Sequence, residues 1–349
     1  MRKIILLFCY LGFISAASLQ ASKPPRRPKN IILIIGDGTG LAQLYAAYTA
    51  KGGKLNIYQF AQYTGLSMTS SFDDYITDSG AGGTAISAGK KTRNGMVGTG
   101  PDSMPIPTLP ELAAAKGLST GTVVTCELTH ATPASFFAHQ PSRKMYPEIA
   151  KDMTNGRGDL LIGGGYPYFD TAELRKRGFT TSIGMEAMKN NTGKRQICFY
   201  NTDSSVQKAT VRGNALEMGC RHAVQKLSRN KKGFFLMVEG SQVDWGGHDN
   251  DSAYLLNEAL DLDSAAGFLF RWAMTDKRTL VIVTADHECG GLTLHGKNTW
   301  TGHPVMHFST GHHTAEPVPV YAFGPGAAHF TGVYENTELF FRMKKLLRL

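Results

Sequence analysis

The sequence is poor in cysteine and in charged residues, and both shortages narrow the possible classes of protein. Its five cysteines have no CxxC spacing, which disfavours a structural zinc cluster built from cysteines. Charged residues make up 19% of the chain, against about 25% in ordinary globular domains, while hydrophobic residues make up 42% and exclude a mostly disordered chain. The 39 glycines follow no G-X-Y period, so they exclude collagen and predict tight turns instead.

The basic residues form no pattern that predicts nucleic-acid binding. Lys and Arg number 37 against 28 Asp and Glu, which gives a formal net charge of +9. Much of this excess lies in short runs, and no stripe of Arg or Lys is interleaved with aromatic residues, as a nucleic-acid groove would require. The positive balance fits an anionic substrate or solubility equally well. We therefore expect no specific nucleic-acid partner.

The first 21 residues have the pattern of a secretory signal peptide. A charged start, MRK, precedes an apolar run over residues 4–14 and then small residues, with cleavage expected near Ala21. The run is too short to span a bilayer, which needs about 20 apolar residues, so no stable membrane anchor is expected. We therefore predict a periplasmic or secreted protein. In that oxidising compartment Cys198 and Cys220 could form a disulfide, and free buried thiols are an equal alternative for Cys126, Cys198, Cys220 and Cys289.

A Pro-rich, basic linker at residues 22–29 precedes what we expect to be one domain over residues 30–349. The expected strands cover residues 31–35, 120–125, 160–162, 234–238, 280–284 and 318–323. The expected helices cover residues 41–50, 146–153, 215–227, 252–274 and 337–348. This alternation predicts an α/β fold, a three-layer sandwich with a central, largely parallel sheet flanked by helices. Residues 155–212 and 292–312 do not fit the alternation and are expected to be loop-rich insertions.

Several expected strands end in groups that bind cations. Asp37 follows the strand at 31–35, Glu239 follows 234–238, and Asp286 with His287 follows 280–284. Ligands gather at the carboxyl ends of strands in open parallel sheets. Unpaired carboxylates at one rim would repel each other and raise each other's pKa values, and cations are the simplest compensation. Mixed Asp and His ligands suit zinc, and carboxylate with hydroxyl suits magnesium.

The segment around Ser79 supplies a candidate nucleophile. Ser79 lies among small residues in DSGAGGTA, where a helix start would present its hydroxyl, together with helix N–H groups, to a bulky anion. The alternative is that Ser79 only caps the helix. A G-x-S-x-G motif is absent, so a Ser-His-Asp hydrolase is not favoured.

Six motifs in a fixed order resemble those of alkaline phosphatases, and the match spans residues 30–348. They are GDG at 36–38, TDS at 77–79, HATPA at 130–134 with Ser142-Arg143, VEGSQVD at 238–244 with His248, VTADH at 283–287, and GHHT at 311–314. The resemblance is strongest to the compact marine bacterial branch, which includes cold-adapted enzymes. It implies an alkaline-phosphatase-like fold and a homodimer.

The resemblance also implies a site with two zinc ions and one magnesium ion per chain. The first zinc would be held by Asp244, His248 and His313. The second would be held by Asp37, Asp286 and His287, and magnesium by Asp37, Thr132 and Glu239. The implied reaction is hydrolysis of small phosphate monoesters to alcohol and inorganic phosphate through a phosphoserine at Ser79, with Arg143 gripping the phosphate. His313 rather than His312 is chosen because the residues after it keep the family's spacing.

Two positions depart from the enteric members of that family. His130 stands where those enzymes have Asp, so we hypothesise that magnesium is held more loosely. Trp245 stands where they have Lys; without that cation phosphate should be held less tightly, unless Trp245 serves only packing. No role is assigned to Glu288 or Cys289, and His295, His303 and His307 are expected to be loop residues.

Two alternative functions remain. A phosphodiesterase or another hydrolase of the alkaline phosphatase superfamily would share the scaffold, but the diesterase branch commonly has Thr as nucleophile and lacks an equivalent of Arg143. The sulfatase signature is absent around Ser79. The more distant alternative is an inactive zinc-binding protein of the periplasm.

Overall fold

Continuous apolar runs form the central strands because helices cover both of their faces. In β1 (Asn30–Gly36) every residue is buried. Ile31, Leu33 and Ile35 belong to one hydrophobic core, whereas Ile32 and Ile34 belong to a second core on the opposite face. Successive residues of the strand therefore point alternately into the two cores, as a sheet between two helical layers requires.

The computed structural model describes residues 27–156, 158–299 and 302–349. The predicted signal peptide at 1–21 and most of the predicted linker at 22–29 lie outside these residues. Within them, none of the helices is both long and apolar enough to cross a membrane.

One large sheet runs through the molecule in the order β14-β2-β13-β8-β1-β7-β3-β4-β6-β5. Of its described strands, β13 alone runs antiparallel to its neighbours, so the predicted largely parallel sheet is confirmed. The other nine strands are β14 (Gly332–Glu335), β2 (Tyr63–Met68), β8 (Thr279–Thr284), β1, β7 (Phe234–Gly240), β3 (Ser119–Glu127), β4 (Leu160–Gly164), β6 (Arg195–Phe199) and β5 (Phe179–Ile183), and β13 covers Val318–Phe323.

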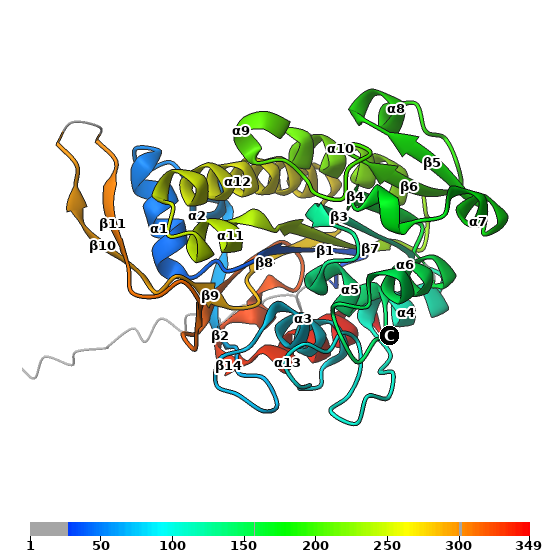
Figure 1. The fold of residues 1–349 in the computed structure, drawn as a ribbon, viewed down its shortest axis with the longest axis horizontal. Helices are drawn as coiled ribbons and strands as arrows, with labels where there is room; N and C mark the ends of the chain where they lie inside the picture. Colours follow the sequence, from blue (N-terminus) through cyan, green and yellow to red (C-terminus); the bar gives the residue numbers. More distant parts are fainter. Residues whose placement is uncertain (1–26, 157, 300–301) are drawn as a thin grey trace, which may run out of the picture.

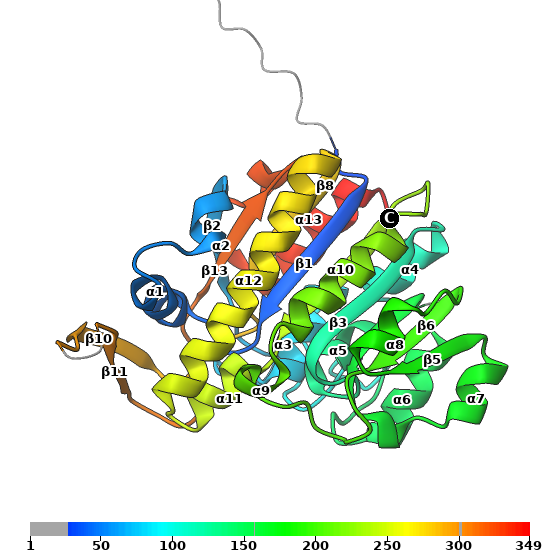
Figure 2. The same cartoon turned by 90° about the horizontal axis from the view of Figure 1, so that it is seen from above.

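Helices cover both faces of this sheet, which gives the predicted three layers (Figures 1 and 2). One face carries α1 (Leu41–Ala50), α2 (Asn56–Phe60), α8 (Met185–Lys189), α10 (Ala215–Leu227) and α12 (Ser252–Asp276). The other carries α3 (Ser79–Ala88), α4 (Leu109–Ala115), α5 (Ala131–Phe137), α6 (Tyr146–Asn155), α7 (Thr171–Lys176) and α13 (Asn336–Leu347). Two further short helices are α9 (Ala209–Arg212), which contacts α12, and α11 (Gln242–His248).

The two segments expected to be loop-rich contain regular structure. Residues 155–212 include β4, β5 and β6, which extend one edge of the main sheet. Residues 292–312 include β10 (Leu292–Lys297) and β11 (Pro304–Phe308), a hairpin that projects from the body beside α1 (Figure 1). Its strands carry His295 and His307, whose rings lie 4.4 Å apart, so these two residues are in strands and not in loops.

The cysteines of the described chain are free and buried. Cys198 lies in β6 and Cys220 in α10, and no disulfide joins them. Of the two possibilities that the sequence left open, the structure has free buried thiols.

Candidate active site

Three buried carboxylates meet at the carboxyl ends of adjacent parallel strands. Asp37 follows β1, Glu239 lies near the end of β7, and Asp286 follows β8. In register, Ile35 of β1 pairs with both Glu239 and Thr284, which places the three strand ends side by side. All three carboxylates have 0% exposed surface. The sheet therefore gathers three carboxyl groups that the surrounding protein covers completely.

The first predicted ligand set converges from two distant segments. Asp244 and His248 lie one turn apart on α11, and His313 comes from β12 (His313–Thr314), which pairs with β9 (Glu288–Cys289). Nε2 of His248 is 3.4 Å from Asp244 Oδ2, and Nε2 of His313 is 3.3 Å from Asp244 Oδ1. The two Nε2 atoms are 3.1 Å apart. Three potential ligand atoms thus point to one place, whereas the exposed His312 does not join them.

Backbone carbonyls fix the orientation of these two histidines. Nδ1 of His248 is 2.8 Å from the carbonyl oxygen of Gly311, and Nδ1 of His313 is 2.9 Å from that of Thr77. A hydrogen bond from Nδ1–H to a carbonyl leaves Nε2 as the free lone pair, which is the usual arrangement of histidines that bind a metal.

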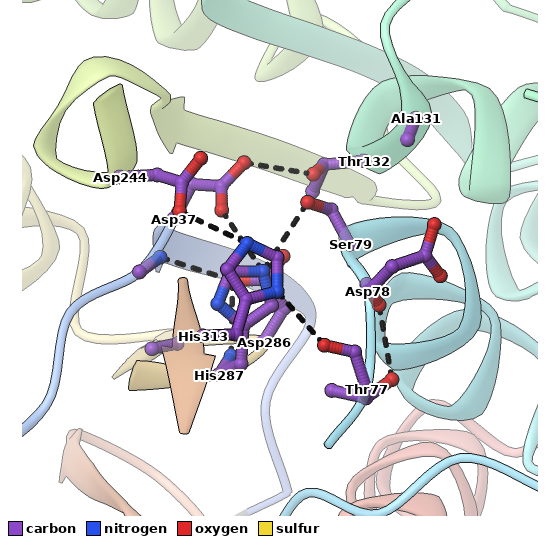
Figure 3. Close-up of polar contacts among 12 residues, drawn as sticks. Asp37, Thr77, Asp78, Ser79, Ala131, Thr132, Asp244, Asp286, His287 and His313 are labelled. Carbon is purple, nitrogen blue, oxygen red and sulfur yellow. Dashed lines mark hydrogen bonds and ion pairs between the residues drawn. The ribbon is translucent and has the colours of Figure 1, made fainter. Parts of the chain in front are cut away.

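The second predicted set surrounds the candidate nucleophile (Figure 3). Nε2 of His287 is 3.4 Å from Asp37 Oδ1 and 3.4 Å from Asp286 Oδ2. The same nitrogen is 3.2 Å from Oγ of Ser79. The hydroxyl of Thr132 donates a 3.3 Å hydrogen bond to Asp37 Oδ2, so Asp37 links this set to the predicted magnesium ligands.

Burial and mutual repulsion raise the pKa values of most of the carboxylates. Burial, followed by the charges of Asp286 and Asp244, raises the pKa of Asp37 well above its ordinary value. Burial and Asp244 raise the pKa of Asp286 to about 7, and burial and Asp286 raise that of Glu239 to about 8. Burial alone would also raise the pKa of Asp244, but the imidazoles of His248 and His313, within 3.4 Å of its carboxylate oxygens, outweigh it and hold that pKa well below the usual value.

Several buried polar atoms in this cluster lack hydrogen-bond partners, which tests whether cations fit. They are Oδ1 of Asp37, Oδ1 of Asp244, Oδ2 of Asp286 and Nδ1 of His287. Orphaned buried acceptors are rare in proteins, and a carboxylate cluster without compensating charge costs free energy. The Asp and His donor set also matches the ligands that zinc prefers. The residues present therefore fit divalent cations.

Ser79 is presented by the first turn of α3 and does not cap it. Asp78 is the N-cap, and its Oδ1 accepts a 2.9 Å hydrogen bond from the N–H of Ala81. Ser79 is 1% exposed and keeps its hydroxyl for the site. A Cβ on Gly82 would stand 3.0 Å from the carbonyl oxygen of Asp286, so the glycine lets the helix approach the strand end closely. This geometry removes the alternative in which Ser79 serves only as a cap.

Arg143 reaches the site from the segment between α5 and α6. Its Nη1 donates a 2.8 Å hydrogen bond to Oδ2 of Asp78, and its Nη2 is 3.4 Å from Nε2 of His130. Burial lowers the pKa of Arg143, but Asp78 outweighs this effect and raises it above the usual value. Burial, and then the charge of Arg143, lowers the pKa of His130 to about 3, so this imidazole is neutral. The Trp245 ring is 6.0 Å from the His130 ring and packs against the hydrophobic core.

Glu288 has a structural role that the sequence did not reveal. Its Oε1 accepts hydrogen bonds from Nε2 of Gln43 at 2.6 Å and from the N–H of Leu292 at 3.1 Å. Its Oε2 accepts from the N–H of Gly291 at 3.2 Å and from the hydroxyl of Thr314.

These contacts tie together the segments that carry the two ligand sets. Gln43 in turn accepts a 3.1 Å hydrogen bond from the N–H of Gly40, in the loop that follows Asp37. Glu288 follows His287, and its partner Thr314 follows His313. The only sequence signal was this adjacency to two ligand motifs.

Replacing Glu288 with alanine is expected to destabilise the protein and weaken its binding of divalent cations. The change removes the acceptor of four hydrogen bonds, two of them buried and two partly buried, and each buried group left unsatisfied costs about 1–3 kcal/mol. We expect a loss of at least about 3 kcal/mol in the free energy of unfolding. Chemical denaturation and metal content after dialysis measure the two effects. The control is Glu316→Ala, an exposed position three residues after His313. If the two variants behaved equally, the structural role assigned to Glu288 would be contradicted.

Comparisons with known proteins all match this chain to alkaline phosphatases. The family model described as alkaline phosphatase matches residues 28–184, 201–310 and 302–349. A curated relative, alkaline phosphatase 4 of Bacillus subtilis, is 31% identical over 424 aligned positions, which cover 94% of this chain and 92% of the relative. The fold and nearly the whole length are therefore shared with proteins of that description.

Solved structures agree with the sequence comparisons. The alkaline phosphatase of the Antarctic bacterium TAB5 is 40% identical with a TM-score of 0.88, over 93% of this chain and 99% of that one. A variant of that enzyme with glutamate in place of a histidine has magnesium bound in its M3 site; it is 39% identical with a TM-score of 0.87, over 93% of this chain and 99% of that one.

Proposed function

The chain belongs to the alkaline phosphatase family, and on this premise we propose that it hydrolyses phosphate monoesters through a phosphoserine at Ser79. One observation carries the proposal. The buried hydroxyl of Ser79 lies 3.2 Å from Nε2 of His287 and beside converging Asp and His side chains. A nucleophile, an anion-binding arginine and sites for cations are the parts that phosphoryl transfer needs.

The donor sets fit two zinc ions and a third divalent ion. Zinc would be held by Asp244, His248 and His313, and by Asp37, Asp286 and His287. When bound, zinc supplies Lewis acidity, which lowers the pKa of a hydroxyl or water and neutralises charge on phosphoryl and leaving oxygens. The resemblance implies magnesium as the third ion, for which Asp37, Thr132 and Glu239 would be the ligands. Magnesium in the M3 site of the TAB5 variant supports a third site in this chain.

The residues of the chain divide the chemistry between them. Oγ of Ser79 attacks phosphorus in line, the bond from phosphorus to the ester oxygen breaks, and the alcohol leaves with a proton. Water then attacks the phosphoserine, the bond from phosphorus to Oγ breaks, Ser79 regains its proton and inorganic phosphate leaves. Arg143 donates from its planar fork to two non-bridging oxygens throughout. Asp78 holds that fork in place through the 2.8 Å hydrogen bond.

Replacing Arg143 with alanine is expected to slow monoester hydrolysis by about 30- to 700-fold in kcat/KM. This range corresponds to about 2–4 kcal/mol, since two charge-assisted hydrogen bonds to the phosphoryl group are lost. Hydrolysis of p-nitrophenyl phosphate measures the loss. The bis(p-nitrophenyl) diester has one anionic oxygen fewer, so its hydrolysis should fall less. Arg221→Ala, on the outer surface of α10, is the control and should leave both rates unchanged.

The same two substrates separate the proposed function from its alternatives. A phosphomonoesterase prefers p-nitrophenyl phosphate to its bis ester, whereas a phosphodiesterase has the reverse preference. An inactive zinc-binding protein would bind zinc and hydrolyse neither. A wild-type preference for the diester would contradict the proposal.

We also propose that the protein is exported and acts as a homodimer. Export rests on the signal-peptide pattern of residues 1–21, and dimerisation rests on the resemblance to the family.

A further inference from the structure

A buried thiol lies beside the predicted third metal site. Cys126, in β3, is fully buried, and its Sγ is 3.7 Å from Oε2 and 3.9 Å from Oε1 of Glu239. Sγ is also 3.3 Å from the carbonyl oxygen of Glu127. Glu239 is one of the residues that the resemblance assigns to magnesium, so a sulfur atom stands within reach of that ion's carboxylate ligand.

His130 completes a cluster with this thiol. One ligand atom each from Cys126, His130 and Glu239 lies within 4.8 Å of the other two. Nδ1 of His130 is buried and has no hydrogen-bond partner.

This cluster does not suit magnesium. Magnesium takes oxygen ligands in near-octahedral geometry, whereas thiolate and imidazole suit zinc and similar transition ions. Zinc bonds of about 2.3 Å to sulfur and 2.0 Å to oxygen in a tetrahedral site place those two atoms about 3.5 Å apart. The 3.7 Å between Cys126 Sγ and Glu239 Oε2 is close to that spacing. The third site therefore offers Glu239 two competing sets of neighbours: the oxygens of Asp37 and Thr132, and the softer atoms of Cys126 and His130.

We propose that the third site of this chain takes a thiophilic transition ion in preference to magnesium, with Cys126, His130 and Glu239 as ligands. The inference rests on the proposed function, because it concerns the third ion of the same centre. Binding ionises the thiol: the S–H bond of Cys126 breaks, its electron pair goes to the ion, and one proton is released to solvent. Zinc and magnesium exclude each other at this site because both require the carboxylate of Glu239.

Cobalt substitution tests the thiolate ligand directly. The full protein is stripped of metal, refilled with Co²⁺, and scanned for the near-ultraviolet absorption of a cobalt–thiolate bond. We expect the band in the wild type and its loss in Cys126→Ser, with Cys126→Ala as the second variant should the serine variant fold poorly.

Two other cysteines serve as matched controls in the cobalt experiment. Cys289 lies beside Asp244, His248 and His313, so it is the other thiol that cobalt could reach. Cys220 lies in α10, away from the centre. Both Cys289→Ser and Cys220→Ser should keep the band. Loss of the band in Cys289→Ser, or no band in the wild type, would overturn the proposal.

Metal content gives an independent reading. With zinc and magnesium both in excess, we expect three zinc ions per wild-type chain and two per Cys126→Ser chain. Two zinc ions and one magnesium ion in the wild type would overturn this inference, while the proposed function would stand if monoester hydrolysis persisted. A chain that binds no zinc and hydrolyses no monoester would overturn both.

Discussion

Ser79→Ala is expected to reduce kcat for p-nitrophenyl phosphate by about 10⁴-fold or more. Removing a covalent nucleophile has effects of this size in serine enzymes, because the remaining groups can only assist direct attack by water. The ligand clusters, Arg143 and the first turn of α3 should stay in place, since Asp78 and not Ser79 caps the helix. Alanine is also a good helix former, so the melting temperature should remain close to that of the wild type.

A second serine of the same helix provides the matched control. Ser87 is also buried on α3, but its hydroxyl donates a 2.6 Å hydrogen bond to the carbonyl oxygen of Ser135. Ser87→Ala should cost about 1 kcal/mol of stability and leave kcat unchanged. Acid quenching during turnover should trap a phosphorylated protein in the wild type and in Ser87→Ala only. A trapped phosphoprotein in Ser79→Ala would contradict the assignment of the nucleophile.

The central part of the fold was predictable because its signals are local. The run that forms β1 is apolar at consecutive positions, which happens when both faces of a strand are buried. The bounds of α1, α10 and β13 match the expectation, since apolar periodicity and a nearby glycine or turn mark their ends. The candidate site could be predicted from the same signals, because side chains that directly follow buried parallel strands lie together at one edge of the sheet.

The remainder depends on contacts that no local pattern contains. β5 is an edge strand with the sequence FTTSI and two exposed residues, so its sequence cannot be told from that of a loop. Glu288 and Gln43 are 245 positions apart, and Cys126 and Glu239 are 113 apart. Neither pair forms a motif, and only folding brings their side chains together. Sequence resemblance located the ligands, but not the residues that position them or compete for them.

Removing the metal ions is expected to abolish monoester hydrolysis and to make stability sensitive to pH. Without cations, Asp286 has a pKa of about 7 and Glu239 of about 8, whereas both groups ionise near pH 4 in the unfolded chain. Between pH 6.5 and 8.5 the unfolded chain has already lost these protons and the folded chain still has to lose them. The folded state therefore binds more protons, and its stability falls as pH rises through the two folded-state values.

The histidines of the first ligand set also make the stability of the folded chain fall as pH rises. His248 has a pKa raised to about 9, chiefly by its hydrogen bond to Asp244, so the folded chain also retains this proton in the same window. His287 and His130 have lowered pKa values and are neutral in the folded chain, whereas in the unfolded chain they lose their protons around pH 6.5. They therefore add a smaller change of opposite sign, confined to the lower end of the window. Asp244, whose pKa is lowered, is ionised in both states throughout the window.

We therefore expect the melting temperature of the metal-free protein to fall by several degrees between pH 6.5 and 8.5, beyond any change in the zinc-loaded protein. The loss corresponds to about 2–4 kcal/mol, since each retained proton changes stability by up to about 1.4 kcal/mol per pH unit. Zinc removes the difference because the folded carboxylates then bind a cation instead of a proton. Asp286→Asn is the matched variant: it removes one of the titrating groups, so its metal-free form should show a shallower fall. A metal-free wild type that gains stability over this range would mean that the carboxylates of Asp37, Glu239 and Asp286 are not crowded together.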